Sequence, residues 1–475
     1  MKSKMMMGSK EIKTLKKTMM VNKGDLDLYL DLFVDGEKVL SKKADSLVAN
    51  FLRILFIQMG GKTDELLPTG YYLKADATID SLSSGTNGLI RVKLTANKTY
   101  ASTGGKAAIY GTNGVIDGIY DYNYISGYYL DLAGTTYASQ TIEKGYVYIF
   151  SSYTASPIPS NENFSSPLIE VGNGNTAVNI ADFCLANKIP NGSGTSELTY
   201  NSMIVAQDTN DSDSAQITFT RSFTNGSGAA VSINEIGMYS TLDNYGSVLI
   251  MRDIISSIEV ANGKTLTVNY RIKTVLDSGA DSGGFVLSFM RLLYRQFGQA
   301  ERAIIDINNT SQSQHYGNAT LKAIGTGGYN YNTSAAYSTS EPGWKQGIVL
   351  GTGSTEVSMS DYFLSEVIGH GTDSGEMVYY GGIIENFIIG DDYAQFDILR
   401  AVGNDSGDTI TVNEYILTAG ARDDASGTAV DIPNYLFTIS RNVLDEGIVV
   451  ADGEILKCVY TIKLIVSTDD SGSGN

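Results

Sequence analysis

The chain has 475 residues, 42% of them hydrophobic, so it is long enough for two or three domains, and wholesale disorder is excluded. Its formal net charge is −18 and its pI is near 4.6, which argues against nucleic acid as the main partner, because duplex binding needs clustered Lys and Arg. Gly (51) and Tyr (30) are frequent while Pro (7) is rare, a composition typical of short β-strands joined by turns.

The first segment along the chain, residues 1–23, carries seven Lys and one Glu. We expect a solvated basic N-terminal arm here. The alternative is a tether that docks on an acidic surface of a partner, such as another copy of the protein. The candidate interface residues in this arm are Lys13, Lys16 and Lys17.

A repeat dominates the rest of the sequence. The stretch VGNGNTAVNIADFCLANKIPNG (171–192) matches LGTGSTEVSMSDYFLSEVIGHG (350–371) at an offset of 179 with no gap. The offset holds downstream to VSINE (231–235) and ITVNE (410–414). It then grows to about 190, so the second copy has a loop longer by some ten residues, after which VLIMRD (248–253) meets FTISRN (437–442). The repeat is marked in the first copy by Gly172, Gly174 and Asp182, and in the second by Gly351, Gly353 and Asp361.

An apolar stretch before each repeat also recurs, SLVANFLRILFIQMGG (46–61) and GFVLSFMRLLYRQFGQ (284–299), and predicts one buried α-helix per copy with a glycine cap. Its offset is 238, so the first copy holds about 59 extra residues (238 − 179). The predicted fold is therefore mainly β, with two homologous β-sandwich-like modules, each opened by one buried helix. The predicted boundaries are 24–278 for module 1, with an insertion at about 61–170; 279–468 for module 2, with a linker at 277–284; and a flexible tail at 469–475.

Within each module, alternating segments predict strands. Turn clusters at 224–229 and 403–408 predict hairpins that join 217–223 to 231–240 and 396–402 to 410–419. The final strand of each module should bury one face; Cys458, at the position of Val268, would be a small buried side chain, and a disulfide with Cys184 is unneeded. The buried residues are expected to be Leu266, Val268, Tyr270 and Ile272 in module 1, and Leu456, Cys458, Tyr460, Ile462 and Leu464 in module 2.

The Gly-x-Gly of each repeat follows an apolar strand, as in phosphate-binding loops. Neither copy has the GK[ST] step or the long following helix of such a loop, so we interpret the glycines as turn-makers. Residues 358–361 then predict the start of a short helix, capped by Ser or Asp.

Catalytic and metal-binding patterns are weak. The chain has two Cys and two His, His315 and His370, without a zinc cluster or a Ser–His arrangement. Glu235 and Glu414 occur in both copies, which favours a structural role, such as binding Arg221 and Arg400 or capping a turn, over acid–base chemistry. QDTNDSDS (207–214) departs from a calcium loop at its sixth and twelfth positions. We expect no enzyme activity, no cofactor and no resident metal, and no apolar run approaches the ~20 residues of a membrane span.

The insertion holds 13 of the 30 Tyr. Tyr presents a rigid apolar ring with a polar tip, which suits recognition of proteins or sugars, whereas the plainer explanation is ordinary strand surface. The candidate interface residues in the insertion are Tyr120, Tyr122, Tyr124, Tyr128 and Tyr129.

The order of these motifs carries a family resemblance. A short helix precedes LGTGSTEVSMSDYFL, a strand pair ending in INEIGMY (233–239) follows, and VLIMRDIISSIEVANGKTLTVNYRIK comes last. This order resembles structural proteins of tailed-bacteriophage virions over most of both modules. The second copy departs from it at NEYILTAG, and the insertion and the arm lie outside it. The composition is similar to that of gut-phage proteins, including those of crAss-like phages.

The resemblance implies a non-enzymatic virion protein of the head, neck or tail, assembled in the host cytoplasm. Its partners would be copies of itself and other virion proteins, because a duplicated domain offers two similar surfaces to a ring or lattice. The alternative is a receptor-binding or glycan-binding fibre protein that uses the Tyr-rich insertion on the host surface. A depolymerase is a third hypothesis.

Overall fold

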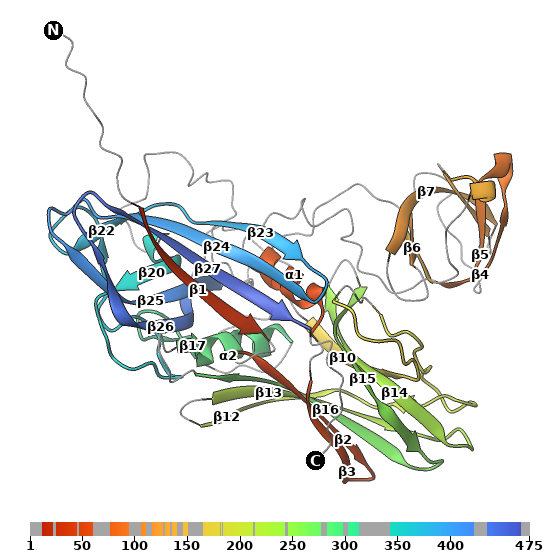
Figure 1. The fold of residues 1–475 in the computed structure, drawn as a ribbon. Helices are drawn as coiled ribbons and strands as arrows, with labels where there is room; N and C mark the ends of the chain where they lie inside the picture. Colours follow the sequence, from red (N-terminus) through yellow and green to blue (C-terminus); the bar gives the residue numbers. More distant parts are fainter. Residues whose placement is uncertain are drawn as a thin grey trace.

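A computed structural model of the chain shows a mainly β protein, as the sequence predicts (Figure 1). The described part contains two α-helices, α1 (Ala49–Gln58) and α2 (Leu287–Gln296). The structure describes residues 12–21, 25–44, 47–59, 77–94, 106–110, 116–126, 129–133, 135–139, 146–150, 165–180, 182, 184–211, 214–242, 246–276, 283–297, 303–312, 343–421 and 435–466.

The first module is built from two sheets. The larger has the order β11 (Thr199–Tyr200), β13 (Ser214–Thr224), β16 (Thr265–Val275), β2 (Asp27–Val34) and β3 (Glu37–Ala44), and β12 (Ile204–Asp211) also pairs with β13. The smaller has the order β10 (Ser165–Gly172), β14 (Val231–Leu242) and β15 (Gly246–Val260).

The second module has the same plan. Its larger sheet has the order β1 (Ile12–Val21), β27 (Ile455–Ile465), β24 (Tyr393–Gly403), β22 (Glu376–Tyr379) and β21 (Gly369–His370), and β23 (Ile383–Ile389) pairs with β24. Its smaller sheet has the order β17 (Gly283–Phe285), β26 (Tyr435–Val450), β25 (Ile410–Ala421) and β20 (Gly347–Gly351). Outside the sheets lie the pair β18 (Ile304–Ile305) and β19 (Ser311–Gln312), and the 3₁₀ turn Gly343–Lys345.

The two modules agree bond by bond around their helices. The N–H of Val48 donates to the carbonyl of Ile250, and the N–H of Val286 donates to that of Ile439. The two donors are 238 residues apart, which is the offset of the helix stretches in the sequence. Both long hairpins, β14–β15 and β25–β26, carry two register shifts at corresponding places. The ten-residue difference in loop length falls between β25 and β26, where 422–434 replaces the shorter 243–245.

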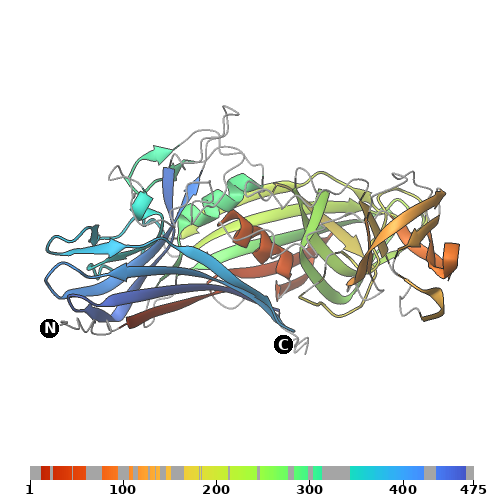
Figure 2. The same cartoon turned by 90° about the horizontal axis from the view of Figure 1, so that it is seen from above.

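Each helix packs on both modules. The helix α1 contacts β15 of its own module and also β23 and β24 of module 2, while α2 contacts β26 of its own module and also β12 and β13 of module 1. Figure 2 shows both helices between the large sheets. Aromatic contacts also join the two modules. The ring centroid of Phe56 on α1 lies 5.2 Å from that of Phe387 and 5.3 Å from that of Phe396. The ring of Phe297, just after α2, lies 4.9 Å from that of Phe219.

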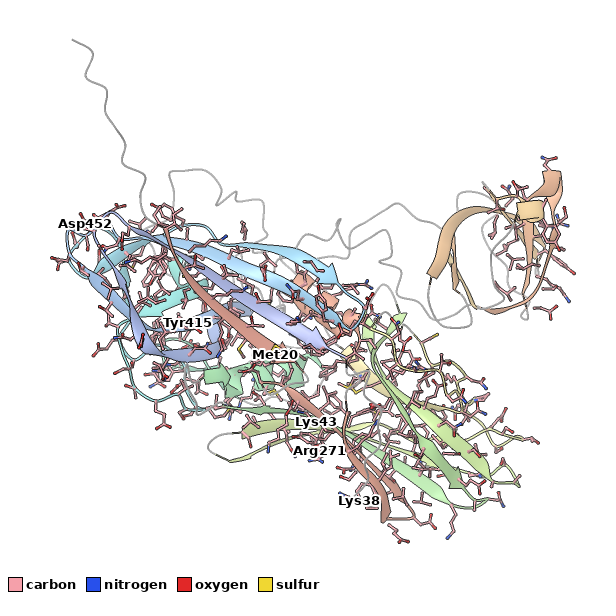
Figure 3. The ribbon with its side chains drawn as sticks, in the orientation of Figure 1. Met20, Lys38, Lys43, Arg271, Tyr415 and Asp452 are labelled. Atoms are coloured by element: carbon pink, nitrogen blue, oxygen red, sulfur yellow. The ribbon has the colours of Figure 1, made fainter. Side chains whose placement is uncertain are left out.

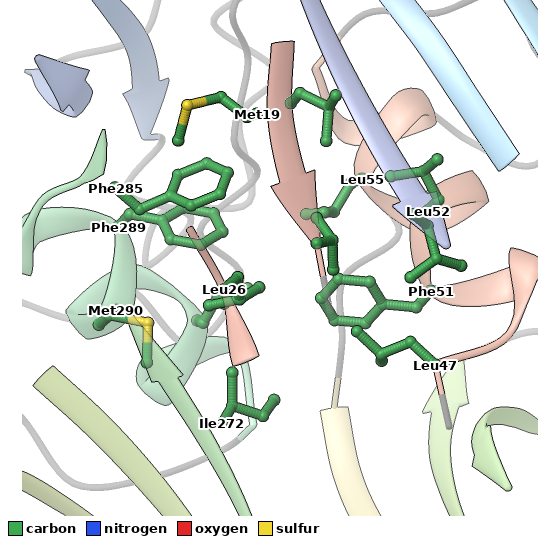
Figure 4. Packing of buried hydrophobic residues seen from close by; sticks show 14 of the residues in the cluster. Met19, Leu26, Leu47, Phe51, Leu52, Leu55, Ile272, Phe285, Phe289 and Met290 are labelled. Carbon is green, nitrogen blue, oxygen red and sulfur yellow. The ribbon is translucent and has the colours of Figure 1, made fainter. Parts of the chain in front are cut away.

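Within the residues that the structure describes, one large hydrophobic core therefore runs through both modules, beside a small second cluster around Leu249. Figure 4 shows its centre, where Met19 of β1, Leu55 of α1 and Phe289 of α2 come from three separate parts of the chain. The modules are therefore not separate domains, because the helix of each module packs against the large sheet of the other.

The expectation of a solvated arm over residues 1–23 is wrong for residues 12–21. They form β1, which runs parallel to β27 from the pair Ile12–Ile455 to the pair Val21–Leu464. Alternate residues explain the pairing: Leu15, Met19 and Val21 are buried, and the polar residues between them are more exposed.

The predicted hairpins across 224–229 and 403–408 are also wrong. β13 pairs with β11, β12 and β16, whereas β14 pairs with β10 and β15, so the turn after β13 carries the chain to the other sheet. Asn225 holds this turn by donating from its side chain to the carbonyls of Ala229 and Val260. Asn404 makes the matching bond to Val450 in module 2.

The predictions for the final strands are confirmed. All the named residues of β16 and β27 are buried, including Cys458, whose thiol pKa burial raises to about 12. Cys184 is half-buried, and neither cysteine forms a disulfide.

The insertion forms a closed six-stranded barrel of its own (Figure 1). Among the described residues its strands pair with one another and with no strand of the modules. Arg91 donates to the buried Asp131 from Nε at 2.7 Å and from Nη2 at 2.9 Å. The barrel order is β4 (Ala77–Ser84), β5 (Ile90–Leu94), β8 (Tyr129–Leu132), β7 (Ile116–Ser126), β6 (Lys106–Tyr110) and β9 (Tyr146–Phe150), with 3₁₀ turns at Thr86–Gly88 and Tyr137–Ser139.

Candidate functional site

The repeat markers of module 1 meet at a buried ion cluster. Arg252 on β15 lies between two carboxylates: its Nη1 is 2.7 Å from Asp182 Oδ2, and its Nη2 is 3.0 Å from Glu235 Oε2. All three side chains are at most 3% exposed. The two carboxylates thus share one guanidinium in a region without bulk water. The attraction between the opposite charges offsets the free-energy cost of burying them.

Glu235 also binds the backbone of the Gly-x-Gly segment and of the loop after it. Its Oε1 accepts the N–H of Gly174 at 3.1 Å and of Asn187 at 2.6 Å, and its Oε2 accepts the N–H of Ala186 at 2.9 Å. One carboxylate on β14 therefore fixes both ends of the 173–187 loop. The guanidinium of Arg252 holds the middle by donating to the carbonyls of Thr176 and Ala177.

Module 2 repeats this cluster. Arg441 Nη1 is 2.7 Å from Asp361 Oδ2, and Arg441 Nη2 is 2.6 Å from Glu414 Oε2. Glu414 accepts the N–H of Glu366 at 2.8 Å and the hydroxyl of Ser365 at 2.8 Å. The carboxylate of Asp361 is more open, at 21% exposed against 3% for Asp182.

The glycines are needed for close approach. A Cβ at Gly174 would stand 2.5 Å from Glu235 Oε1 and 2.8 Å from the Cβ of Ala186, which is closer than real atoms come. The interpretation of the glycines as turn-makers is therefore incomplete, because they let a buried carboxylate reach the backbone.

We expect Gly174→Ala to lower the free energy of unfolding by about 1–3 kcal/mol, the usual cost of forcing extra atoms into a packed site. Urea denaturation would measure it. The matched control is Gly226→Ala, whose added Cβ would meet nothing closer than Ser193 at 3.7 Å. Equal stability of the two variants would contradict the close-packing explanation.

The short helix predicted from residue 358 is absent, and turns occupy the segment. Asp361 nevertheless accepts the N–H of Ser358 at 2.9 Å, and Asp182 accepts the N–H of Asn179 at 2.9 Å. The carboxylate of each aspartate thus accepts a backbone N–H of its local turn and also binds an arginine, Arg441 in module 2 and Arg252 in module 1. The capping residue was identified correctly, but it ends a turn and not a helix.

Arg221 and Arg400 are not the partners of the repeated glutamates, so that part of the prediction is wrong. Arg400 donates to the carbonyls of Gln346, Ile348 and Tyr380, and Arg221 makes comparable bonds to Ile169 and Asn201. Their guanidinium groups each lie 4.9 Å from the ring centroid of a tyrosine, Tyr379 and Tyr200 respectively.

Arg252 and Arg441 are the residues that the sequence interpretation missed. The alignment of VLIMRD with FTISRN does place them at the same position. That signal was available, but β-strand spacing alone does not say which of several arginines reaches a buried carboxylate.

The two clusters differ in their electrostatics. Burial disfavours the charged form of Glu414, but the N–H of Glu366 and the guanidinium of Arg441 outweigh it and lower the pKa of this carboxyl. At Asp182 burial prevails over the charge of Arg252, so the pKa of Asp182 is raised.

The lowered pKa of Glu414 predicts a pH-dependent contribution to stability. A carboxyl with a lowered folded pKa stabilises the fold above its unfolded pKa and loses this contribution as pH falls through the folded value. The difference in unfolding free energy between wild type and Glu414→Gln should therefore be largest near pH 7 and should shrink below about pH 4. Denaturation curves across this range would show it; the exposed Glu446→Gln is the control, and a difference independent of pH would contradict the assignment.

The other candidate residues lie apart from the clusters. Lys13 is 2.8 Å from Glu454 of the same chain, Lys16 is exposed and Lys17 is half-buried. In the barrel, Tyr120, Tyr122 and Tyr124 occupy alternate positions of β7, Tyr129 begins β8 half-buried, and Tyr128 lies outside the described residues.

Within the described part of the chain, no group of three or more His, Cys, Asp or Glu is placed to hold a metal ion. No helix among those residues is long and apolar enough to cross a membrane. Comparisons with protein-family models, with curated proteins and with solved structures find no match.

Proposed function

We propose that the chain is a non-enzymatic structural component of a tailed-phage virion, in the head, neck or tail, which assembles through its two β-rich modules. The observation that carries the proposal is the exchange of helices between the modules. It joins two similar modules in one body with a shared core, a plan that suits a subunit of a ring or lattice.

The use of the repeated polar residues supports this role. Glu235, Arg252 and Asp182 all bind within their own module, and their counterparts do the same. Charges that bind one another in both copies are suited to holding loops in place. The order of the sequence motifs, which resembles that of tailed-phage virion proteins, supports a place in the virion.

Mass spectrometry and cryo-EM of purified particles from the encoding phage test the proposal. We expect the protein in the particles at a fixed copy number; a few copies would indicate the neck or tail, and hundreds the shell. Detection only in infected cytoplasm and not in purified particles would overturn the proposal.

The barrel supports a second candidate, a receptor-binding or glycan-binding protein of a fibre. Its strands form a closed unit that begins after α1 and ends before β10, so it could act separately from the modules. Deletion of residues 61–164, which leaves β10 in place, distinguishes the two functions. Intact particles that no longer adsorb to the host would favour the adhesin, and failed particle assembly would favour the structural role.

A further inference from the structure

We propose that His370 makes one end of module 2 sensitive to acid: protonation of its imidazole breaks the hydrogen bond that it accepts from the N–H of Tyr379 and loosens the β21–β22 edge. The corresponding bond of module 1 has an acceptor that does not titrate, so the two modules should respond differently to acid. The response is a property of the folded chain and does not depend on the proposed virion role.

The imidazole of His370 closes the turn between β21 and β22. Its Nδ1 accepts the backbone N–H of Tyr379 at 3.1 Å. His370 also pairs in parallel with Met377, and the N–H of Gly371 donates to the carbonyl of Met377 at 3.2 Å. A backbone N–H can only donate, so Nδ1 must be the unprotonated ring nitrogen. A second proton on the ring binds at Nδ1 and removes the acceptor.

Module 1 makes the same bond with an amide. Asn191, which lies 179 residues before His370 (370 − 191), accepts the N–H of Tyr200 at its side-chain oxygen at 2.9 Å. Asn191 also pairs in parallel with Leu198, and the N–H of Gly192 donates to the carbonyl of Leu198 at 3.0 Å. The two turns therefore share their geometry, but only the one in module 2 has an acceptor that gains a charge in mild acid.

The tyrosine that donates this bond is anchored in the same way in both modules. The hydroxyl of Tyr379 donates to the carbonyl of Ile368 at 2.9 Å, and the hydroxyl of Tyr200 donates to that of Ile189 at 2.6 Å. Because the buried ring of Tyr379 is held at its tip, we expect the loss of the bond to move the turn that carries His370 and to leave the tyrosine in place.

The groups that face His370 disfavour its charged form on balance. Burial lowers the pKa of His370, the positive charge of Arg400 on β24 lowers it further, and the carboxylate of Glu376 on β22 opposes them. The phenol of Tyr379 adds no charge, because burial raises its pKa. The neutral imidazole is therefore the form that fits the folded state.

The single tryptophan of the chain lies against this imidazole. The ring centroids of Trp344 and His370 are 6.2 Å apart, and the ring planes are inclined by 25°. This separation is at the limit of about 6 Å for attraction between a cation and a ring. The ammonium of Lys345 already lies 5.4 Å from the centroid of Trp344. The indole thus does little to hold a charged imidazole, but a protonated imidazole beside it quenches its fluorescence, so Trp344 can report the titration.

The turn lies at the end of module 2 that is farther from module 1, on which Figure 3 labels Lys38. The hydroxyl of Ser374 in this turn donates to Asp408, and the N–H of Gly407 donates to Asp452, which Figure 3 labels at this end. Movement of the β21–β22 edge would therefore act first on these neighbouring turns.

The stability that the bond contributes should be lost in mild acid. A histidine with a lowered folded pKa stabilises the fold above its unfolded pKa, about 6.5, and loses this contribution as pH falls from there through the folded value. Across this window the open form of the turn should become more populated by up to about tenfold per pH unit.

Two measurements on the full chain, from about pH 8 to about pH 5, test the proposal: Trp344 fluorescence, and hydrogen exchange of the Tyr379 amide corrected for its intrinsic pH dependence. We expect the wild type to lose fluorescence with a midpoint below about pH 6.5, and to lose amide protection by up to about tenfold per pH unit. His370→Asn, which gives module 2 the acceptor of module 1, should show neither change. His315 is present in both proteins and cancels from the comparison. The amide of Tyr200 is the internal control and should stay protected.

The converse substitution is Asn191→His, which should bring the acid response to the Tyr200 amide. A folded Asn191→His variant without that response would contradict the role of the bond. A wild-type chain that follows His370→Asn at every pH would overturn the proposal. An acid response that persists in His370→Asn would overturn it as well, because another group would then be its source.

Discussion

Replacement of Arg252 by Ala is expected to lower the free energy of unfolding by about 3–5 kcal/mol, the usual cost of removing one partner of a buried ion pair. The substitution leaves the carboxylates of Glu235 and Asp182 buried without their shared cation. The loop that Arg252 holds through Thr176 and Ala177 loses those bonds as well. Arg441→Ala should have a comparable effect in module 2.

Urea denaturation followed by circular dichroism measures both variants. Lys264→Ala is the control, because the pair between Lys264 and Asp35 is exposed, and this substitution should leave the transition unchanged. An Arg252→Ala variant as stable as the control would show that the buried cluster does not stabilise the fold.

Replacement of Phe56 by Ala should lower the free energy of unfolding by about 3–5 kcal/mol, as for other buried phenylalanines. The ring belongs to the helix of module 1, but its aromatic neighbours Phe387 and Phe396 belong to module 2. The loss should therefore weaken both modules together. Phe297→Ala, which removes the contact with Phe219, is the equivalent change in the other helix.

Thermal and urea unfolding of these variants test the exchanged contact. Tyr362→Ala removes an aromatic ring that is 38% exposed and should change stability by no more than about 0.5 kcal/mol. If Phe56→Ala gave two separate transitions, with that of module 2 at its wild-type position, the shared core would be refuted.

The sequence predicts the mainly β fold and the two helices, because each element follows from the spacing of neighbouring residues. The 238-residue offset of the helix stretches reappears in the hydrogen bonds of Val48 and Val286. The alternation of β16 predicts its buried face, including Tyr270, since strand periodicity depends only on neighbouring residues.

Long-range pairing was harder to predict. Residues 12–21 alternate between buried and more exposed positions, but their lysines hide this pattern in the sequence. A lysine can lie on an edge strand with its stem against the sheet and its charge in water, so the segment was predicted to be an arm and not a strand. The turn at Asn225 has the composition of a hairpin, but which sheet receives the next strand depends on packing across the core. The glutamate partners were misassigned for the same reason: Arg221 and Arg252 are equally plausible by residue type, and only the three-dimensional register distinguishes them.

The central claim, that the two modules are one body with a common core, can be tested with one fluorophore. Trp344 is the single tryptophan and lies in module 2, 5.2 Å from the ring of Tyr379. In the module 1 variant Arg252→Ala, the urea transition read by Trp344 fluorescence should shift to lower urea together with the circular dichroism transition. A tryptophan transition that stays at the wild-type midpoint while circular dichroism shows an earlier phase would contradict the claim.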